Sequence, residues 1–137
     1  LDSFEKHKDR DCVIFSRYVV NGDDLRSHYR KLPSLILNKT CQYLLSSKIK
    51  DYTSCIMFFK RNLLSDIFPQ NSYYANFIIE FVFSLIIKKK NYLEVGFVQK
   101  TITEQNSKSA PNKLKFFKNG FFYLITIFKC VLLKIKN

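Results

Sequence analysis

The feature that most limits the possible folds is a long apolar segment in the middle of the chain. From Tyr74 to Lys90 the sequence is hydrophobic nearly all round a helical projection and contains one carboxylate, Glu80. A helix that is apolar on every side has to be surrounded by other elements. The segment is therefore predicted to be a core helix. Glu80 is predicted to meet a cation or backbone donors there in a structural network, because an unpaired buried charge is costly.

Shorter patterns on both sides of this segment predict the other elements. Apolar runs at Cys12–Phe15, Cys55–Phe59 and Tyr92–Val98 suit strands. A helix is expected from about Pro33 to Ser47, because proline is tolerated in the first helical turn. Val20–Arg26 is expected to form a loop. Strands and helices in alternation predict an α/β fold.

The last segment, residues 113–137, is expected to form a basic amphipathic helix separate from a domain spanning residues 1–112. Its longest uncharged stretch, Asn119–Phe128, is shorter than the roughly 20 residues that a transmembrane helix needs. The pattern favours a helix that lies in the interfacial region of a membrane. A helix packed on the domain's own core is the alternative.

Charge and cysteine usage narrow the possible partners. The net charge of +12 favours an anionic partner such as nucleic acid, an acidic membrane surface or a phosphorylated substrate. No nucleic acid is expected, since the chain has no motif such as an aromatic RNP run. The four cysteines are widely spaced and are expected to be reduced, mostly buried thiols in a cytosol-facing protein. The chain begins at Leu1 without a signal peptide, which predicts a fragment.

Several short motifs follow one another between Asp11 and Lys108. They are Ser-Arg-Tyr at the end of the run Asp11–Tyr18, the R-x-x-x-S-x-x-x-N spacing of Arg30, Ser34 and Asn38, the D-x-T-S start at Asp51–Ser54, Phe77–Glu80 in the apolar segment, Glu94-Val95, and Ser107-Lys108. In this order they resemble family 2 glycosyltransferases of the dolichol- or polyprenol-phosphate mannosyl- or glucosyltransferase type. The chain departs from the family where Phe15 replaces a glycine, where Cys55, Ile56 and Met57 replace Gly-Phe-Arg, and where Gly96 replaces a proline.

This resemblance implies the C-terminal half of a GT-A (nucleotide-diphospho-sugar transferase) domain. The nucleotide-binding strand and the D-x-D motif of the family would precede Leu1, so the ligands of a divalent cation, Mg²⁺ or Mn²⁺, are expected outside this chain. The implied activity is inverting transfer of a hexose from a nucleotide sugar to a polyprenyl phosphate. It would take place at the cytoplasmic face of a membrane, with the protein peripheral or monotopic. The isolated fragment is expected to be inactive.

The resemblance also implies roles for individual residues. Arg17 and Arg30 are expected to hold the lipid phosphate, since guanidinium groups bind phosphate in bidentate fashion, and Lys108 to close over the departing diphosphate. The residues expected to bind the acceptor phosphate or substrate are Ser34, Asn38, Asp51, Thr53 and Ser54. No metal-ligating residue is expected in this chain.

Structural alternatives exist for most of these residues. Arg17 could pair with Asp51, Arg30 could be a solvated loop cation, and Asn38 could be a polar surface position. Ser34 could cap a helix locally, and Asp51 could organise a turn. Pro33 argues against Arg30 and Ser34 sharing one helical face.

Two other functions fit the same residues. One is a family 2 transferase that acts on a soluble glycan or protein acceptor, suggested by the substitutions at Cys55–Met57. The other is a noncatalytic basic module that binds anionic lipid or, without a recognisable motif for it, nucleic acid, which the net charge of +12 permits.

Overall fold

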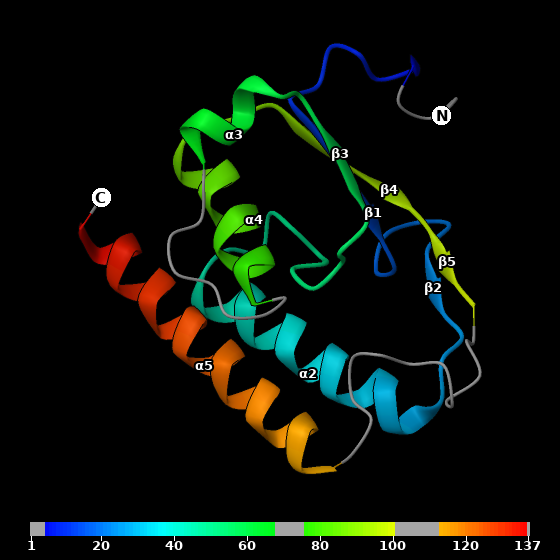
Figure 1. Cartoon of the computed structure of the whole chain (residues 1–137). Coiled ribbons are helices and arrows are strands. Elements are labelled where there is room, and N and C mark those ends of the chain that lie inside the picture. The colour runs from blue at the N-terminus through cyan, green and yellow to red at the C-terminus, as the bar shows by residue number, and fades with distance from the viewer. Residues whose placement is uncertain (1–4, 68–75, 101–112, 137) are drawn as a thin grey trace.

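The fold is α/β and is built on a small mixed sheet. A computed structural model of the chain describes residues 5–67, 76–100 and 113–136, with side chains from residue 119 onward in the last range. The sheet has the strand order β3-β1-β4, with β1 (Cys12–Ser16) in the centre. β1 is parallel to β4 (Tyr92–Gly96) and antiparallel to β3 (Met57–Phe59) (Figure 1).

The central strand is buried on both faces, as its continuous apolar sequence predicted. Cys12 and Ile14 point into the hydrophobic core, whereas Val13 points to the opposite face and is also buried. β3 begins two residues later than the predicted start at Cys55, because the residues before Met57 are still part of the loop that follows Asp51.

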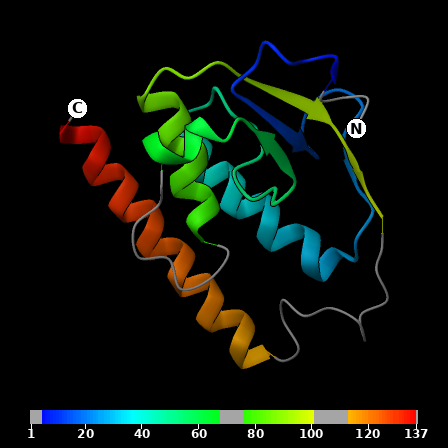
Figure 2. The same ribbon diagram turned by 45° about the horizontal axis from the view of Figure 1, so that its top comes forward.

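The helices lie on one side of the sheet (Figure 2). They are α2 (His28–Leu44), the short α3 (Asn62–Asp66), α4 (Phe77–Ile87) and α5 (Lys113–Lys136). The prediction that a helix starts at Pro33 is wrong, since Pro33 lies inside α2. The Ser27 carbonyl accepts the first bonds, from the amides of Arg30 and Lys31. The locked φ of proline fits a helix, and near the N-terminus the loss of one N–H is tolerated.

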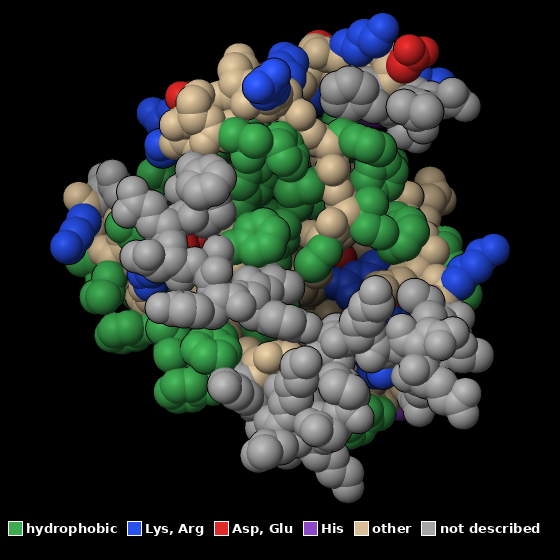
Figure 3. Space-filling view, in the orientation of Figure 1, with side chains coloured by type: hydrophobic (Ala, Val, Ile, Leu, Met, Phe, Trp, Pro, Cys, Tyr) green, Lys and Arg blue, Asp and Glu red, His purple; other side chains and the backbone are tan. Residues whose placement is uncertain are grey.

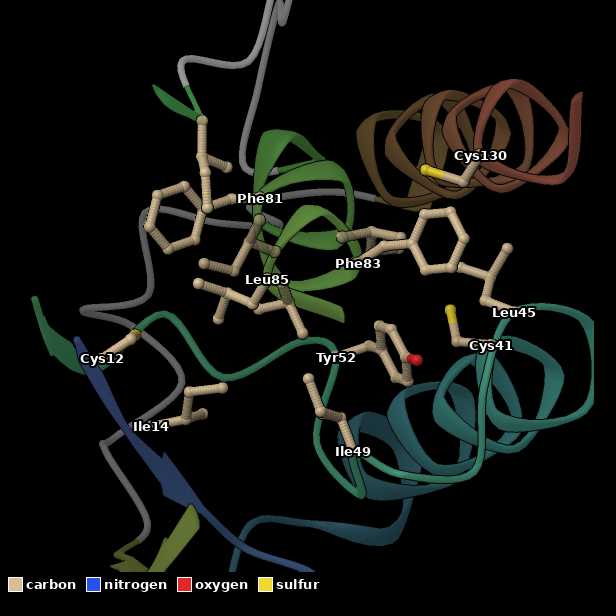
Figure 4. Packing of buried hydrophobic residues seen from close by; sticks show 14 of the residues in the cluster. Cys12, Ile14, Cys41, Leu45, Ile49, Tyr52, Phe81, Phe83, Leu85 and Cys130 are labelled. Atoms are coloured by element: carbon tan, nitrogen blue, oxygen red, sulfur yellow. The ribbon is translucent and has the colours of Figure 1, made fainter. Parts of the chain in front are cut away.

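α4 is the core helix that the apolar segment predicted. Six of its residues are buried against the sheet and the other helices (Figure 4), namely Ile78, Ile79, Phe81, Val82, Phe83 and Leu85. Its predicted start at Tyr74 lies outside the described residues. The predicted partner of Glu80 is a lysine of α5, because the Nζ of Lys129 lies 3.1 Å from both carboxylate oxygens.

α5 packs on α4 and α2 and contributes to the same hydrophobic core. Ile127 and Cys130 are buried in it, and Asn76 Nδ2 donates to Thr126 Oγ1 at 2.8 Å. The opposite side of α5 carries exposed apolar side chains. No helix among the described residues is long and apolar enough to cross a membrane.

The cysteines are free, as predicted, and three of the four are buried. Burial raises the pKa of Cys12, Cys41 and Cys130 to about 12, so these thiols are protonated at neutral pH. Cys55 is exposed.

A second, two-stranded sheet lies beyond the end of β1. β2 (Asp23–Asp24) pairs in parallel with β5 (Val98–Gln99), so the predicted loop at Val20–Arg26 contains a short strand. This strand could not be predicted, because two residues within a sequence typical of turns show no hydrophobic periodicity. The predicted strand Tyr92–Val98 is interrupted at Phe97 and is divided between β4 and β5.

Close backbone approach explains Gly96, which ends β4. A Cβ at this position would lie 2.3 Å from the carbonyl oxygen of Val20 and 2.8 Å from the amide nitrogen of Gly22. The loop after β1 therefore runs directly over the glycine, with Asn21 at a φ of 63°. Side chains cannot relieve such a clash, because the atoms involved belong to the backbone.

We expect Gly96→Ala to lower the free energy of unfolding by about 3 kcal/mol, since the loop after β1 would have to move. Gly120→Ala is the matched control, because a Cβ there meets nothing within 4 Å and alanine favours a helix by about 1 kcal/mol over glycine. Urea denaturation followed by circular dichroism measures both. Equal effects of the two substitutions would contradict the close approach.

Candidate functional site

The candidate site lies where β1 and β4 end side by side. Arg17 directly follows β1, and its amide donates to Asp51 Oδ2 at 3.0 Å. The carboxyl ends of neighbouring parallel strands are a common location for binding sites in α/β folds. Motif residues from the loop at 51–54 and from α2 meet Arg17 at this edge.

Arg17 and Asp51 form a buried bidentate ion pair. Arg17 Nε lies 2.8 Å from Asp51 Oδ2, and Nη2 lies 2.8 Å from Oδ1. Desolvation, the largest single influence, lowers the pKa of Arg17, but the hydrogen bonds and charge of Asp51 outweigh it, and the pKa is raised. The pairing that was the structural alternative for Arg17 is therefore present.

The remaining donors of Arg17 also contact protein acceptors. Nη2 donates to Thr53 Oγ1 at 2.7 Å, and Nη1 donates to Gln99 Oε1 at 3.2 Å and lies 3.6 Å from Asp24 Oδ2. A guanidinium that contacts a carboxylate, a hydroxyl and an amide in this way is suited to holding those groups in place. A direct contact with phosphate would require some of these bonds to be exchanged.

Thr53 is the centre of the network. Its hydroxyl accepts from Arg17 and from Asn38 Nδ2, each at 2.7 Å, and lies 3.3 Å from Ser34 Oγ and from Asp51 Oδ1. One side chain therefore links β1, α2 and the loop at 51–54.

Asn38 fixes that loop on α2. Its Oδ1 accepts from the Tyr52 amide at 2.6 Å, while its Nδ2 donates to Thr53 and to the Ser34 carbonyl. The interpretation of Asn38 as a surface residue is wrong, because its side chain is fully buried. A buried amide with each polar atom bonded specifies one position of the loop.

Arg30, Ser34 and Asn38 are spaced by four residues on one helix. α2 runs through Pro33 without a break, so the three residues share a helical face, and the doubt raised by Pro33 is wrong. Arg30 is half-buried on that helix and is not a loop cation. Ser34 bonds across the fold, since Tyr18 Oη lies 3.4 Å from its Oγ.

Ser54 and Glu94 support the loop from outside the network. Ser54 Oγ donates to the Phe15 carbonyl, which ties the loop to β1. The Glu94 carboxylate accepts from the amides of Lys50 at 2.8 Å and Asp51 at 2.9 Å. Burial raises the pKa of Glu94.

Sequence reasoning missed some members of the site. The ring of Tyr18 stacks on Arg17, with the guanidinium carbon 5.1 Å from the centre of the ring. The Ser-Arg-Tyr run was the one signal in the sequence that included Tyr18. Asp24 is buried and bonds Arg26 at 2.6 Å. Asp24 and Gln99 belong to no motif, so no signal in the sequence could have found them. Lys108 lies outside the described residues.

The described residues have no group that fits a divalent cation. No cluster of three or more His, Cys, Asp or Glu side chains occurs among them. Asp24 and Asp51 face guanidinium groups, and Asp11 lies 3.3 Å from Lys60 Nζ and accepts from the Asn91 amide. These carboxylates are engaged with protein donors.

Comparisons with protein-family models, with curated proteins and with solved structures find no match to this chain. The arrangement of its own residues has to define the site. It gathers hydroxyl, amide, guanidinium and carboxylate groups at one sheet edge, where the guanidinium donors are bonded to protein acceptors.

We expect Thr53→Val to lower the free energy of unfolding by about 2 to 4 kcal/mol, because the buried side chains of Arg17 and Asn38 would each lose an acceptor. Thr40→Val makes the same chemical change on α2, where the hydroxyl donates to the Ile36 carbonyl of the same helix, and is expected to stay within about 0.5 kcal/mol of wild type. Thermal and urea denaturation of both variants tests this. Similar values for the two would show that Thr53 is not the centre of the network.

Proposed function

We propose that this chain is the acceptor-side half of an inverting family 2 glycosyltransferase. The complete enzyme would transfer a hexose from a nucleotide sugar to a polyprenyl phosphate. A phosphate oxygen of the lipid attacks the anomeric carbon, and the bond to the nucleotide diphosphate breaks as the new C–O bond forms. An ionised phosphate is already a competent nucleophile, so this reaction needs positioning and charge neutralisation more than a strong base.

The observation that carries this proposal is the convergence of the motif residues. Arg17, Ser34, Asn38, Asp51 and Thr53 were selected from the sequence by their resemblance to the family's motifs, and they form one hydrogen-bonded network. Polar residues from separate elements come together only where they stabilise the same part of the fold or build the same site. The network is polar and lies at the edge where binding sites of α/β folds occur.

The contacts suggest different roles for the two arginines. Arg17 is a positioning residue, because its guanidinium holds Asp51 and Thr53. Arg30 lies one helical turn before Ser34 and is half-buried, so it is the better candidate to contact the lipid phosphate. One turn further along α2, Ser34 offers a hydroxyl group that lies 3.4 Å from the Tyr18 hydroxyl. Lys108 keeps its proposed role at the departing diphosphate.

The rest of the enzyme would supply what this chain does not contain. The nucleotide sugar and a divalent cation, Mg²⁺ or Mn²⁺, are expected to bind ligands outside this chain, and this chain alone is expected to be inactive. The reaction would take place at the cytoplasmic face of a membrane, with the protein peripheral or monotopic. The basic amphipathic α5 supports that location.

A noncatalytic role has one observation in its favour. Arg17 is buried and bonded to protein acceptors, as expected for a purely structural ion pair. In that case the chain would be a basic membrane-binding remnant. A soluble glycan or protein acceptor is the further alternative, suggested by Cys55–Met57 in place of the family's Gly-Phe-Arg.

We expect Arg30→Ala in the complete enzyme to lower kcat/KM for polyprenyl phosphate by about 100-fold, because the phosphate would lose a charged bidentate partner. Arg61→Ala is the control, since Arg61 is exposed beside α3. Lys108→Ala is also expected to slow turnover. The assay follows transfer of radiolabelled sugar to lipid.

An unchanged rate for Arg30→Ala would exclude the proposed phosphate contact. Transfer to a soluble acceptor without any polyprenyl phosphate would favour the alternative substrate class. No transfer by the wild-type complete protein to either acceptor would favour the noncatalytic role.

A further inference from the structure

The outer faces of α2 and α5 both carry stripes of exposed apolar side chains. On α2 the stripe consists of Tyr29, Leu32, Ile36 and Tyr43, and on α5 it consists of Phe121, Leu124, Ile125, Phe128, Leu132 and Ile135. Each of these side chains is at least 45% exposed, and Tyr43 reaches 87%. The spacing within each stripe follows the helical repeat, so each stripe occupies one side of its helix. The opposite sides of the two helices are buried in the core, at Cys41 and at Ile127 and Cys130.

The two helices are neighbours, so their stripes belong to one surface. α2 and α5 run side by side in both ribbon views (Figures 1 and 2), on the side of the molecule away from the sheet. Lys134 Nζ donates to the Leu44 carbonyl at 3.0 Å and joins the two helices near their C-terminal ends. The space-filling view shows hydrophobic side chains along the outer side of α5 (Figure 3). We call these two stripes together the two-helix face.

The charges of the two helices have one sign. α2 contains Arg30, Lys31 and Lys39, and α5 contains six lysines, whereas neither helix contains an aspartate or a glutamate. The carboxylates of the described residues lie elsewhere, on the sheet side, in loops, on α3 and on α4. Lys31 and Lys129 each lie beside a carboxylate of another element, Asp23 at 3.9 Å and Glu80 at 3.1 Å, whereas Lys39, Lys134 and Lys136 are exposed. An apolar surface flanked by exposed cations complements a membrane with an apolar interior and anionic headgroups.

We propose that the two-helix face docks on an anionic phospholipid bilayer, with α2 as well as α5 in the interface. A second copy of this chain is a poor occupant, because it would bring like charges opposite each other. A nucleic acid is also a poor occupant, since exposed Leu, Ile and Phe side chains would meet a charged backbone. Lipid headgroups neutralise the lysines while the acyl boundary takes up the apolar stripes.

This docking would also place the candidate site, a consequence that rests on the proposed function. Ser34 and Asn38 lie on the inner side of α2, opposite Leu32 and Ile36. With α2 on the bilayer, the network would lie within about one helix diameter, about 10 Å, of the headgroups. A polyprenyl phosphate could then reach the network with its chain still in the membrane.

The test measures binding of the 137-residue chain to phosphatidylcholine vesicles with and without phosphatidylglycerol by flotation. Wild type should bind the anionic vesicles much more strongly, with binding weakened by salt. Leu32→Gln with Ile36→Gln on α2, and Leu124→Gln with Phe128→Gln on α5, should each lower the partition coefficient at least about tenfold. Val20→Gln with Ile56→Gln is the matched control, because both residues are exposed on other elements.

If the double variant on α2 bound anionic vesicles as wild type does, and only the double variant on α5 bound more weakly, the two-helix face would be overturned. Equal binding to vesicles with and without phosphatidylglycerol would overturn the role of charge. A dimer in solution that the same variants dissociate would identify the face as a protein interface and overturn the proposal.

A second measurement does not depend on how the glutamine variants fold. Tyr43→Cys in a Cys55→Ser background places an environment-sensitive dye on the exposed stripe of α2. Its emission should shift to the blue on anionic vesicles, whereas a dye at Val20→Cys should not respond. No shift at Tyr43→Cys would overturn the docking of α2.

The two proposals fail in different ways. If the chain bound vesicles but the complete protein transferred no sugar, the proposed function would be wrong and the two-helix face would still stand. If both proposals hold, Leu32→Gln with Ile36→Gln should slow transfer to an acceptor embedded in vesicles. The same variant should not change transfer to an acceptor dispersed in detergent.

Discussion

The buried Arg17–Asp51 ion pair is the interaction on which the rest of the candidate site depends. Asp51 receives the guanidinium and the amide of Arg17, so the loop at 51–54 is fixed directly to the end of β1. Thr53 and Asn38 then extend the same connection to α2. Removing one member of a buried pair leaves an uncompensated charge, typically a loss of about 3 to 5 kcal/mol. The loop and α2 therefore hold their positions together.

The pair can be buried because apolar elements close the fold on its other side. α4 fills the space between the sheet and α5, and its one carboxylate is neutralised by Lys129. α5 thus contributes both apolar contacts and a counter-charge to the core. The backbone contact at Gly96 holds the loop after β1 against β4, which keeps Arg17 at the sheet edge.

Features with a strong period could be predicted from the sequence. The apolar run of α4, the apolar strand β1 and the helix at 113–136 follow from hydrophobic pattern alone, and the cation beside Glu80 follows from the cost of a buried charge. The predicted start of α2 was wrong because proline can lie within the first turns of a helix as well as at its first position. β2 and β5 depend on pairing between distant segments, so two residues in each could not reveal them.

The same distinction applies to the candidate site. The motif order selected Arg17, Ser34, Asn38, Asp51 and Thr53, but it could not tell which donor serves which acceptor. That depends on three-dimensional contacts, and the choice between positioning and phosphate binding for Arg17 depends on Gln99 and Asp24, which no motif includes. The amphipathic character of α5 was predicted from the sequence, whereas the exposed stripe of α2 could be identified only after the structure showed which side of that helix is buried. A helix with one apolar side in the core and another at the surface has a sequence that does not tell which side is buried, and in this chain α2 and α5 both have that character.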